Sequence, residues 1–244
     1  MPELRHIGAV FRIHLARLRA EAGPFLLAAL VFPTAMYLFA NAIRGEAAGD
    51  QNRFRFLAGS IVFSLSLTAI SWLGYLLLEN RFTGRLKLFA TLPLAPSSYV
   101  FGVLIFGVVQ SFLGCGALLV VARLLGARTQ LAVLPLTVTI LLTMLCLSGI
   151  SVIIATRTRS FSEGSLLTDS FGAGLVFLAP VYYSPEAMPR ALRVVSEWLP
   201  TARAAHAVQA ALAGSYATSD LAILGVMAIV SLSIGFKLMR FREN

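Results

Sequence analysis

Charged side chains are scarce in this chain. Only 13% of its 244 residues are Asp, Glu, Lys or Arg, against 58% hydrophobic residues, whereas an ordinary soluble domain carries about a quarter charged residues. The chain has two lysines, Lys87 and Lys237, and neither belongs to a glycine-rich phosphate loop of the form GxxxxGK[ST]. The composition excludes an ordinary soluble domain, and the missing loop excludes an ATPase within this sequence.

Cysteine and histidine are also scarce, with two and three residues respectively. Cys115 and Cys146 both lie in apolar stretches, where small buried hydrophobic residues are favoured over a disulfide or a metal site. No histidine is spaced with cysteine or aspartate as metal ligands would be, and no nucleophile constellation is visible. We therefore expect no metal, no cofactor and no catalytic residue in this chain, which we do not expect to be an enzyme.

Six long apolar stretches stand out against this background. Each is close to the ~20 residues that a helix needs to cross the ~30 Å hydrocarbon layer. Of all charged residues, only Asp169 and Lys237 fall inside them. The stretches cover residues 24–43, 56–78, 99–122, 131–155, 165–183 and 221–239. The pattern predicts an all-α, polytopic membrane protein with six transmembrane helices in a single domain, residues 1–244.

The basic residues flank these stretches and explain the net charge of +9. Basic residues beside anionic lipid account for this charge better than nucleic-acid binding does. Twelve Lys and Arg residues, counting Lys237 at the end of the sixth stretch, lie toward the two termini and in the loops after the second and fourth stretches, and eight lie in the other three loops. By the positive-inside rule this bias predicts that both termini are cytoplasmic.

The first 23 residues have the pattern of an amphipathic helix. Apolar residues recur at steps of three and four, while arginines repeat every seven on the opposite side. These positions are Leu4, Ile7, Phe11, Leu15 and Leu18, and Arg5, Arg12 and Arg19. A basic amphipathic helix of this kind is typical of the membrane interface, so we expect one on the cytoplasmic surface.

The loop of residues 79–98 carries a second short helical pattern. Leu86, Phe89 and Leu92 share one helical face, Gly84 can release the end of the second span, and Pro93 ends the pattern. A loop that only joins two spans needs no such helix. The pattern favours contact with another protein or with the lipid headgroups.

Residues 184–215 form a third segment with helical character, on the opposite side of the membrane. Ser184, followed by Pro185 and Glu186, predicts a helix start. Pro200 interrupts the pattern, and an alanine-rich helix from Thr201 follows. We expect two half-apolar helices that lie on, or dip into, the outer leaflet, where irregular backbone must be covered by protein or water.

A row of hydroxyl side chains follows one face of the second span and reaches Glu79. Small hydroxyl residues permit close helix packing, and the same face could line a translocation pathway or a dimer seam. Both interpretations stay open. The row consists of Ser60, Ser64, Thr68, Ser71 and Tyr75.

Asp169 is the only acidic residue within a predicted span. An ionisable residue at such a position is a candidate functional group. It lies about one turn after the predicted helix start, where the helix dipole stabilises an anion. This position favours a structural or interfacial role over contact with a substrate.

Two of these segments resemble the permeases of the ABC-2 type exporter family. The resemblance lies in the run Pro180–Arg193 followed by Trp198–Gly214, and in Glu79–Gly84 continuing into Leu86–Pro93. It also covers the plan of an interfacial helix followed by six spans. Gln209 stands where the family often has arginine, and Pro200 is not preceded by the frequent asparagine.

The resemblance implies a half-transporter that exports a drug, lipid, glycan or similar amphipathic substrate from the cytoplasmic membrane of a prokaryote. A second permease chain, identical or homologous, would complete the pathway. Two separate ATP-binding subunits would carry ATP and Mg²⁺. The other partners expected are membrane lipids, with no nucleic acid.

The resemblance also assigns roles to residues of the loops and spans. The coupling segment that contacts the ATPase would comprise Glu79, Arg81, Gly84, Arg85, Leu86, Lys87, Leu88, Phe89, Leu92 and Pro93. The outer gate helices would use Pro185, Glu186, Met188, Pro189, Leu199 and Pro200. The candidate pathway or dimer face consists of the hydroxyl row and Asp169.

Two other classes of protein compete with this interpretation. An intramembrane lipid-modifying enzyme or protease needs clustered acids or a Ser–His pair at membrane depth, and the spans hold one acid and no histidine. An ion-coupled secondary transporter usually shows an internal repeat and interrupted helices, and the sequence shows neither.

Overall fold

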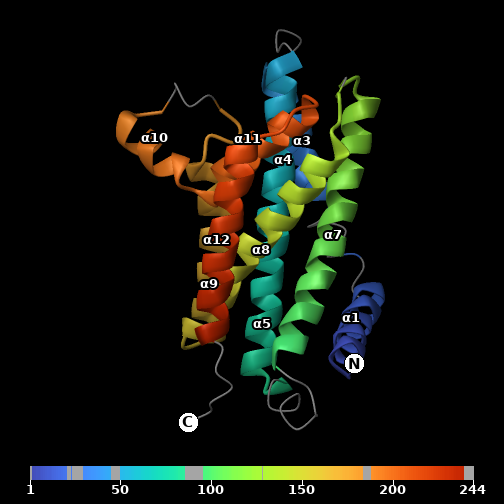
Figure 1. Ribbon diagram of the computed structural model, residues 1–244, viewed down its shortest axis with the longest axis vertical. Helices are drawn as coiled ribbons and strands as arrows, with labels where there is room; N and C mark the ends of the chain where they lie inside the picture. The colour runs from blue at the N-terminus through green and yellow to red at the C-terminus, as the bar shows by residue number, and fades with distance from the viewer. Residues whose placement is uncertain are drawn as a thin grey trace.

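The computed structural model describes residues 2–20, 23, 30–44, 50–85, 96–127, 129–183 and 188–238. These ranges are helical and contain no β-strand, as the sequence predicts. The helices are α1 (Pro2–Ala20), α3 (Phe32–Arg44), α4 (Asp50–Ser66), a π-helical segment (Leu67–Trp72), α5 (Leu73–Phe82), α7 (Pro96–Leu124), α8 (Val133–Arg157), α9 (Phe161–Leu178), α10 (Arg190–Glu197), α11 (Pro200–Leu212) and α12 (Thr218–Leu238). The longer helices form a bundle along the long axis of the molecule (Figure 1).

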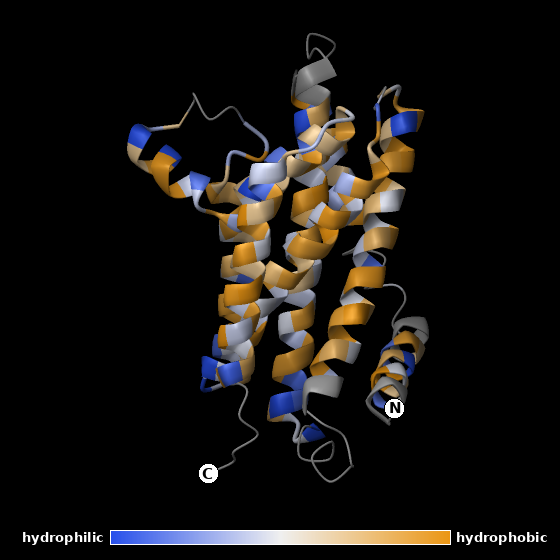
Figure 2. Cartoon of the chain, viewed as in Figure 1, coloured by the Kyte–Doolittle hydropathy of each residue, from blue (hydrophilic) through white to orange (hydrophobic). Residues whose placement is uncertain are grey.

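Four helical segments of the described ranges are long and apolar enough to cross a membrane. They are Phe54–Phe82, Tyr99–Leu124, Val133–Arg157 and Thr218–Leu238. Figure 2 shows hydrophilic residues concentrated at the two ends of the bundle, with a mostly apolar band between them. Each segment agrees with one of the six predicted spans, so the membrane class that the sequence indicates is confirmed by the arrangement of the helices.

The other two predicted spans have different bounds in the structure. Part of the stretch 24–43 lies outside the described residues, and its later part is helix α3. The stretch 165–183 corresponds to α9, which begins at Phe161 and ends at Leu178. The Ser160 hydroxyl caps the earlier start, where it accepts a hydrogen bond from the Glu163 N–H at 3.1 Å. Pro180 explains the earlier end, because the residue before a proline avoids the helical conformation.

The second predicted span forms the centre of the bundle. Helix α4, the π-helical segment and α5 form one continuous rod, and most side chains from Phe56 to Leu78 are buried. The rod packs on α7, α8 and α9. The widened turn at Leu67–Trp72 was not expected from the apolar pattern. Such turns change which residues share a helix face, so the hydroxyl row does not follow a straight stripe.

Glycines set the closest approaches between helices. A Cβ atom added at Gly149 of α8 would lie 2.4 Å from Ser231 Oγ of α12, and one added at Gly74 of α5 would lie 2.4 Å from Thr168 Cγ2 of α9. Small residues at such contacts let helix backbones approach closely in a membrane, where packing rather than the hydrophobic effect drives helix association.

Helix α1 packs along α7, beside the lower part of α7 in Figure 1. Val10 is buried against Gly102, and the Phe11 and Phe106 rings meet edge to face with centroids 6.0 Å apart. Arg12 on the far side is exposed, as the amphipathic pattern predicts, but the apolar Ile13 is exposed as well. The helix is confirmed, and its place in the membrane interface stays a prediction.

The helix predicted to start at Ser184 falls partly outside the described residues. Residues 184–187 lie outside the described part of the chain, Met188 and Pro189 are not helical, and α10 starts at Arg190. Pro189 holds Met188 out of the helical conformation, and the start at Ser184 stays a prediction. The interruption before α11 is confirmed, with Leu199 as the N-cap and Pro200 in the first turn, where the missing N–H of proline has no cost.

Candidate functional site

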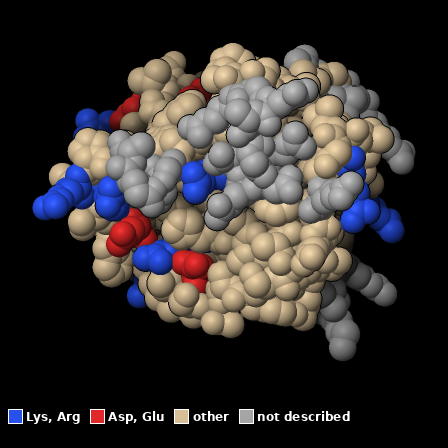
Figure 3. Space-filling model, turned by 90° about the horizontal axis from the view of Figure 1, so that it is seen from above, with Lys and Arg blue, Asp and Glu red and all other residues tan. Residues whose placement is uncertain are grey.

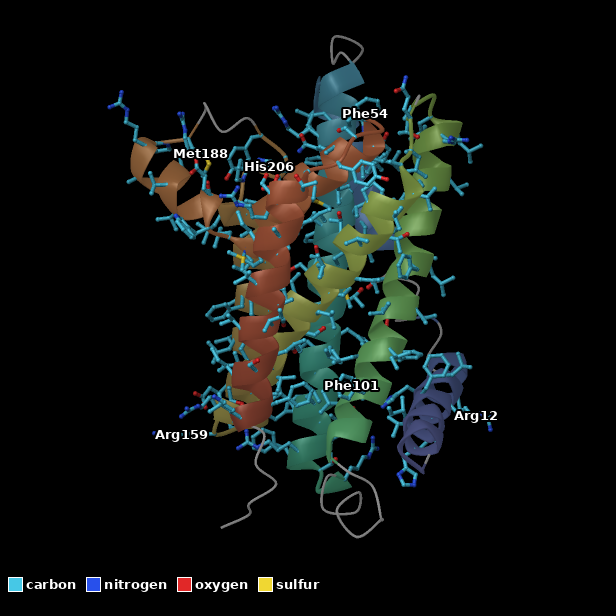
Figure 4. All side chains as sticks on the ribbon, in the orientation of Figure 1. Arg12, Phe54, Phe101, Arg159, Met188 and His206 are labelled. Atoms are coloured by element: carbon cyan, nitrogen blue, oxygen red, sulfur yellow. The ribbon has the colours of Figure 1, made fainter. Side chains whose placement is uncertain are left out.

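The two ends of the bundle carry different kinds of structure. One end holds the last turn of α5, the first turn of α7 and the α8–α9 connection, and the other holds α10 and α11 (Figure 1). Figure 4 places Arg159 at the first end, with Arg12 on α1 toward it, and Phe54, Met188 and His206 toward the second. Those residues predicted for coupling and for the outer gate that the structure describes therefore lie at opposite ends.

The last turn of α5 leads into the segment predicted for coupling. Gly84 has φ of +76°, which releases the chain from the helix as predicted. Arg85 Nη1 lies 3.2 Å from Glu79 Oε1, and the Thr83 hydroxyl donates to the Glu79 carbonyl at 2.6 Å. The remaining predicted coupling residues, Leu86, Lys87, Leu88, Phe89, Leu92 and Pro93, lie outside the described residues.

Arg81 fixes the end of α5 against the end of α8. Its Nη1 atom donates to the Ala155 carbonyl at 2.6 Å and to the Thr158 carbonyl at 2.9 Å. Carbonyls at a helix C-terminus have no partner within the helix and carry partial negative charge, so a guanidinium satisfies both needs. Arg81, which the sequence placed in the coupling group, thus also connects two transmembrane helices.

A buried hydrogen bond joins the two flanks of the predicted coupling segment. The side-chain amide of Asn80, on α5, donates to the Tyr99 hydroxyl, on α7. Both residues are buried, and the Tyr99 ring contacts His14 of α1. The sequence analysis missed Asn80 and Tyr99, because a pair of this kind depends on how two helices meet across a loop.

The opposite end is built on α11, which enters the bundle. Its alanine-rich face packs on α4, α8, α9 and α12, and the Thr201 hydroxyl donates to the Leu175 carbonyl of α9. The backbone N–H groups of Gln130 and Ala132 donate to the Leu212 and Ala211 carbonyls at 3.1 and 2.9 Å. These bonds satisfy the end of α11, which allows the helix to lie among its neighbours.

The predicted gate residues surround the start of α10 and α11. Met188 and Pro200 are buried, Pro189 is exposed, and Leu199 is half-buried. Pro185 and Glu186 lie outside the described residues. The structure brings Met188 close to α10, where the Ser196 hydroxyl lies 3.9 Å from its sulfur atom. Whether these residues gate a pathway stays a prediction.

An ion pair that the sequence analysis missed joins α11 to α12. Arg203 Nη1 lies 3.0 Å from Asp220 Oδ1, and Arg203 Nε donates to the Glu197 carbonyl of α10 at 2.8 Å. Figure 3 shows acidic and basic side chains next to each other on this end of the molecule. In the sequence, the one indication of this ion pair was that Asp220 lies directly before the sixth apolar stretch.

The hydroxyl row is divided by the structure. Ser60, Ser64 and Thr68 are buried inside this chain, while Ser71 and Tyr75 are half-buried. A Cβ atom added at Gly172 of α9 would lie 2.9 Å from Ser71 Oγ, so the row includes a close helix contact. A role for these residues in a pathway or a dimer seam stays a prediction.

Asp169 lies on α9 and is exposed, and its carboxylate accepts a hydrogen bond from the Tyr75 hydroxyl of α5. The two candidate residues are therefore brought together. The dipole argument for Asp169 does not hold, because α9 begins at Phe161 and Asp169 lies beyond its first turn. Glu163 occupies that turn instead.

The described part of the chain holds no group of three His, Cys, Asp or Glu side chains that could bind a metal ion. Cys115 and Cys146 are buried and are not bonded to each other. The arrangement of polar groups serves helix ends and helix contacts, with membrane-length apolar helices between two polar ends. It defines a multi-pass helical membrane protein.

Comparison with protein families shows which kind of membrane protein this is. The family described as ABC-2 type transporter matches residues 12–213. The chain belongs to this family and is a transporter membrane component, as the resemblance of its two motifs indicated. Comparison with curated proteins gives no match.

Proposed function

We propose that this chain is the permease subunit of an ABC exporter and forms half of a translocation pathway. The observation that carries the proposal is the family match over residues 12–213, together with four membrane-length helices in the described part of the chain. Helices α3 and α9 would complete six spans in the cytoplasmic membrane of a prokaryote. Both termini would be cytoplasmic, in accord with the bias of twelve basic residues against eight.

ATP hydrolysis would occur on two separate ATP-binding subunits, since this sequence has no phosphate-binding loop. The coupling segment would follow Gly84 and contact one of these subunits. Two hydrogen bonds support a mechanical connection between this segment and the spans. Arg81 of α5 donates to a carbonyl at the end of α8, and Asn80 of α5 donates to Tyr99 of α7. A force applied to the segment would therefore reach three transmembrane helices.

The outer end would close the pathway shared with a second permease chain. Helix α10 supports a membrane or partner contact, because its apolar side chains are uncovered in this chain. Val194 and Trp198 are 61% and 71% exposed, and exposed apolar surface of this kind marks interaction sites. The substrate would be a drug, a lipid, a glycan or a similar amphipathic compound.

Copurification tests this function. The chain is expressed together with the product of any neighbouring gene that carries a phosphate-binding loop, and the complex is isolated through a tag on the permease alone. We expect the ATPase at equal stoichiometry, with ATP hydrolysis that depends on both chains. A purified permease that moves cargo in vesicles without any ATPase would instead support an ion-coupled transporter and reject the proposal.

A further inference from the structure

Asp169 is exposed on the surface of the chain, and with α9 as one of the six proposed spans it would lie at membrane depth. The residue is eight positions after Phe161, so a rise of about 1.5 Å per residue places it roughly 12 Å along α9. The apolar residues that follow it continue to Leu178. A carboxylate at this depth needs a compensating group, because an uncompensated charge in the hydrocarbon region is expensive.

Two other acids of this structure have such groups. Glu79 pairs with Arg85, and Asp220 pairs with Arg203. Among the side chains that the structure describes, no basic group pairs with Asp169. Its hydrogen-bond partner there is the neutral Tyr75 hydroxyl, which orients the carboxylate but carries no positive charge.

The Tyr75 ring lies beside this carboxylate and contacts a second aromatic ring, that of Phe161. The Tyr75 and Phe161 rings have centroids 6.3 Å apart, and Phe161 is 42% exposed. The hydroxyl of Ser71 lies one helical turn from Tyr75. An oriented carboxylate beside the half-buried Tyr75 ring has the chemistry that recognises an organic cation, through charge and through cation–π contact.

A second copy of this chain is a poor source of a positive charge that could pair with Asp169. Within the six apolar stretches the one basic residue is Lys237, which lies in the last turn of α12. The arginines lie outside these stretches. The missing charge is therefore better provided by a mobile ligand than by a partner permease of the same sequence.

We propose that Tyr75 and Asp169 form a binding site for lipophilic organic cations, with the carboxylate holding the positive centre and the Tyr75 and Phe161 rings covering its apolar groups. The proposal rests on the proposed function in that such a cation becomes the exported substrate. It narrows the amphipathic substrates to those with a positive charge. Binding itself needs no ATPase.

The test measures binding of tetraphenylphosphonium to the purified full-length chain in lipid nanodiscs, by equilibrium dialysis against empty nanodiscs. We expect saturable binding by the wild type and a loss of about tenfold or more in Asp169→Asn, because removal of one partner of a desolvated charge pair is costly. Asp169→Glu keeps the charge and should restore most of the binding. Tyr75→Phe should weaken it by a smaller factor, since it removes only the orienting hydroxyl.

Two matched controls make the result specific. Glu197→Gln removes an exposed acid at the opposite end of the bundle and should bind as the wild type does. Triphenylphosphine oxide has a similar shape without net charge, and its binding should be the same in the wild type and in Asp169→Asn. Thermal unfolding of each variant in the same nanodiscs shows whether the chain remains folded.

Equal binding of the cation by wild type and Asp169→Asn overturns the proposal, as does absence of saturable binding by the wild type. If Asp169→Asn instead separates permease dimers and leaves cation binding unchanged, the acid serves a chain contact and the proposal fails. These outcomes are independent of copurification with an ATPase, so failure of the cation site and failure of the transporter assignment can be told apart.

Discussion

Arg203 and Asp220 form an ion pair, 3.0 Å from Nη1 to Oδ1, between the alanine-rich helix α11 and the first turn of α12. The same guanidinium donates through Nε to the Glu197 carbonyl at the end of α10. One side chain thus connects the three helices that would form the outer end of the transporter. The contact is partly shielded from water, which makes it stronger than a surface pair.

Replacement of Arg203 by leucine should therefore lower the free energy of unfolding by about 1–2 kcal/mol. Loss of one partner of a fully buried pair costs about 3–5 kcal/mol. The Arg203 and Asp220 side chains are 24% and 13% exposed, so the expected cost is smaller. Detergent-induced unfolding, followed by helical circular dichroism, measures the change. In a cycle with Asp220→Asn the two effects should be less than additive; full additivity would show that the pair contributes nothing.

A small residue at position 149 should be essential for packing of α8 on α12. Gly149→Ala places a Cβ atom 2.4 Å from Ser231 Oγ, and overpacking of this kind costs about 1–3 kcal/mol. The control is Gly116→Ala in α7, where an added Cβ meets nothing within 4 Å. We expect it to be neutral or stabilising by up to about 1 kcal/mol, the helix propensity gained over glycine. Equal melting temperatures for the two variants would contradict this packing role.

The predicted coupling segment is tested by replacing Leu88 and Phe89 with aspartate. Two charges on a small, mostly apolar contact should greatly reduce the amount of ATP-binding subunit that copurifies. The permease should still purify as a folded chain, because both residues lie outside the predicted spans. Ser215→Asp, exposed at the opposite end, serves as the matched control. Unchanged association in the double variant would mean that residues 85–92 do not form the coupling helix.

The orientation in the membrane can be measured with single cysteines. The starting chain carries Cys115→Ala and Cys146→Ala, both at buried positions. In intact cells, Ser215→Cys should react with an impermeant thiol reagent, whereas Arg85→Cys and Arg159→Cys should react only after the membrane is opened. All three positions are exposed in the chain, so lack of reaction reports the side of the membrane. The reverse pattern would place both termini outside.

Much of the architecture could be read from local sequence. Apolar runs of membrane length, with charge excluded from them, predicted the rods that contain α7, α8 and α12 within a few residues, because hydrocarbon imposes its thickness on every helix that crosses it. Gly84 and Pro200 marked helix boundaries correctly, since φ above zero and a missing N–H are properties of single residues. The two family motifs were also local, and the match over residues 12–213 confirms the family.

The tertiary structure decided which polar groups meet. Tyr75 with Asp169, Asn80 with Tyr99, and Arg203 with Asp220 are each 17 or more positions apart in the chain. Apolar periodicity carries no information on how two helices are rotated about their axes. The π-helical turn at Leu67–Trp72 adds to this, because it changes the phase of the central rod. The sequence by itself determined that this chain is a helical membrane protein, and only the packing of the helices decided that Asp169 faces outward beside Tyr75.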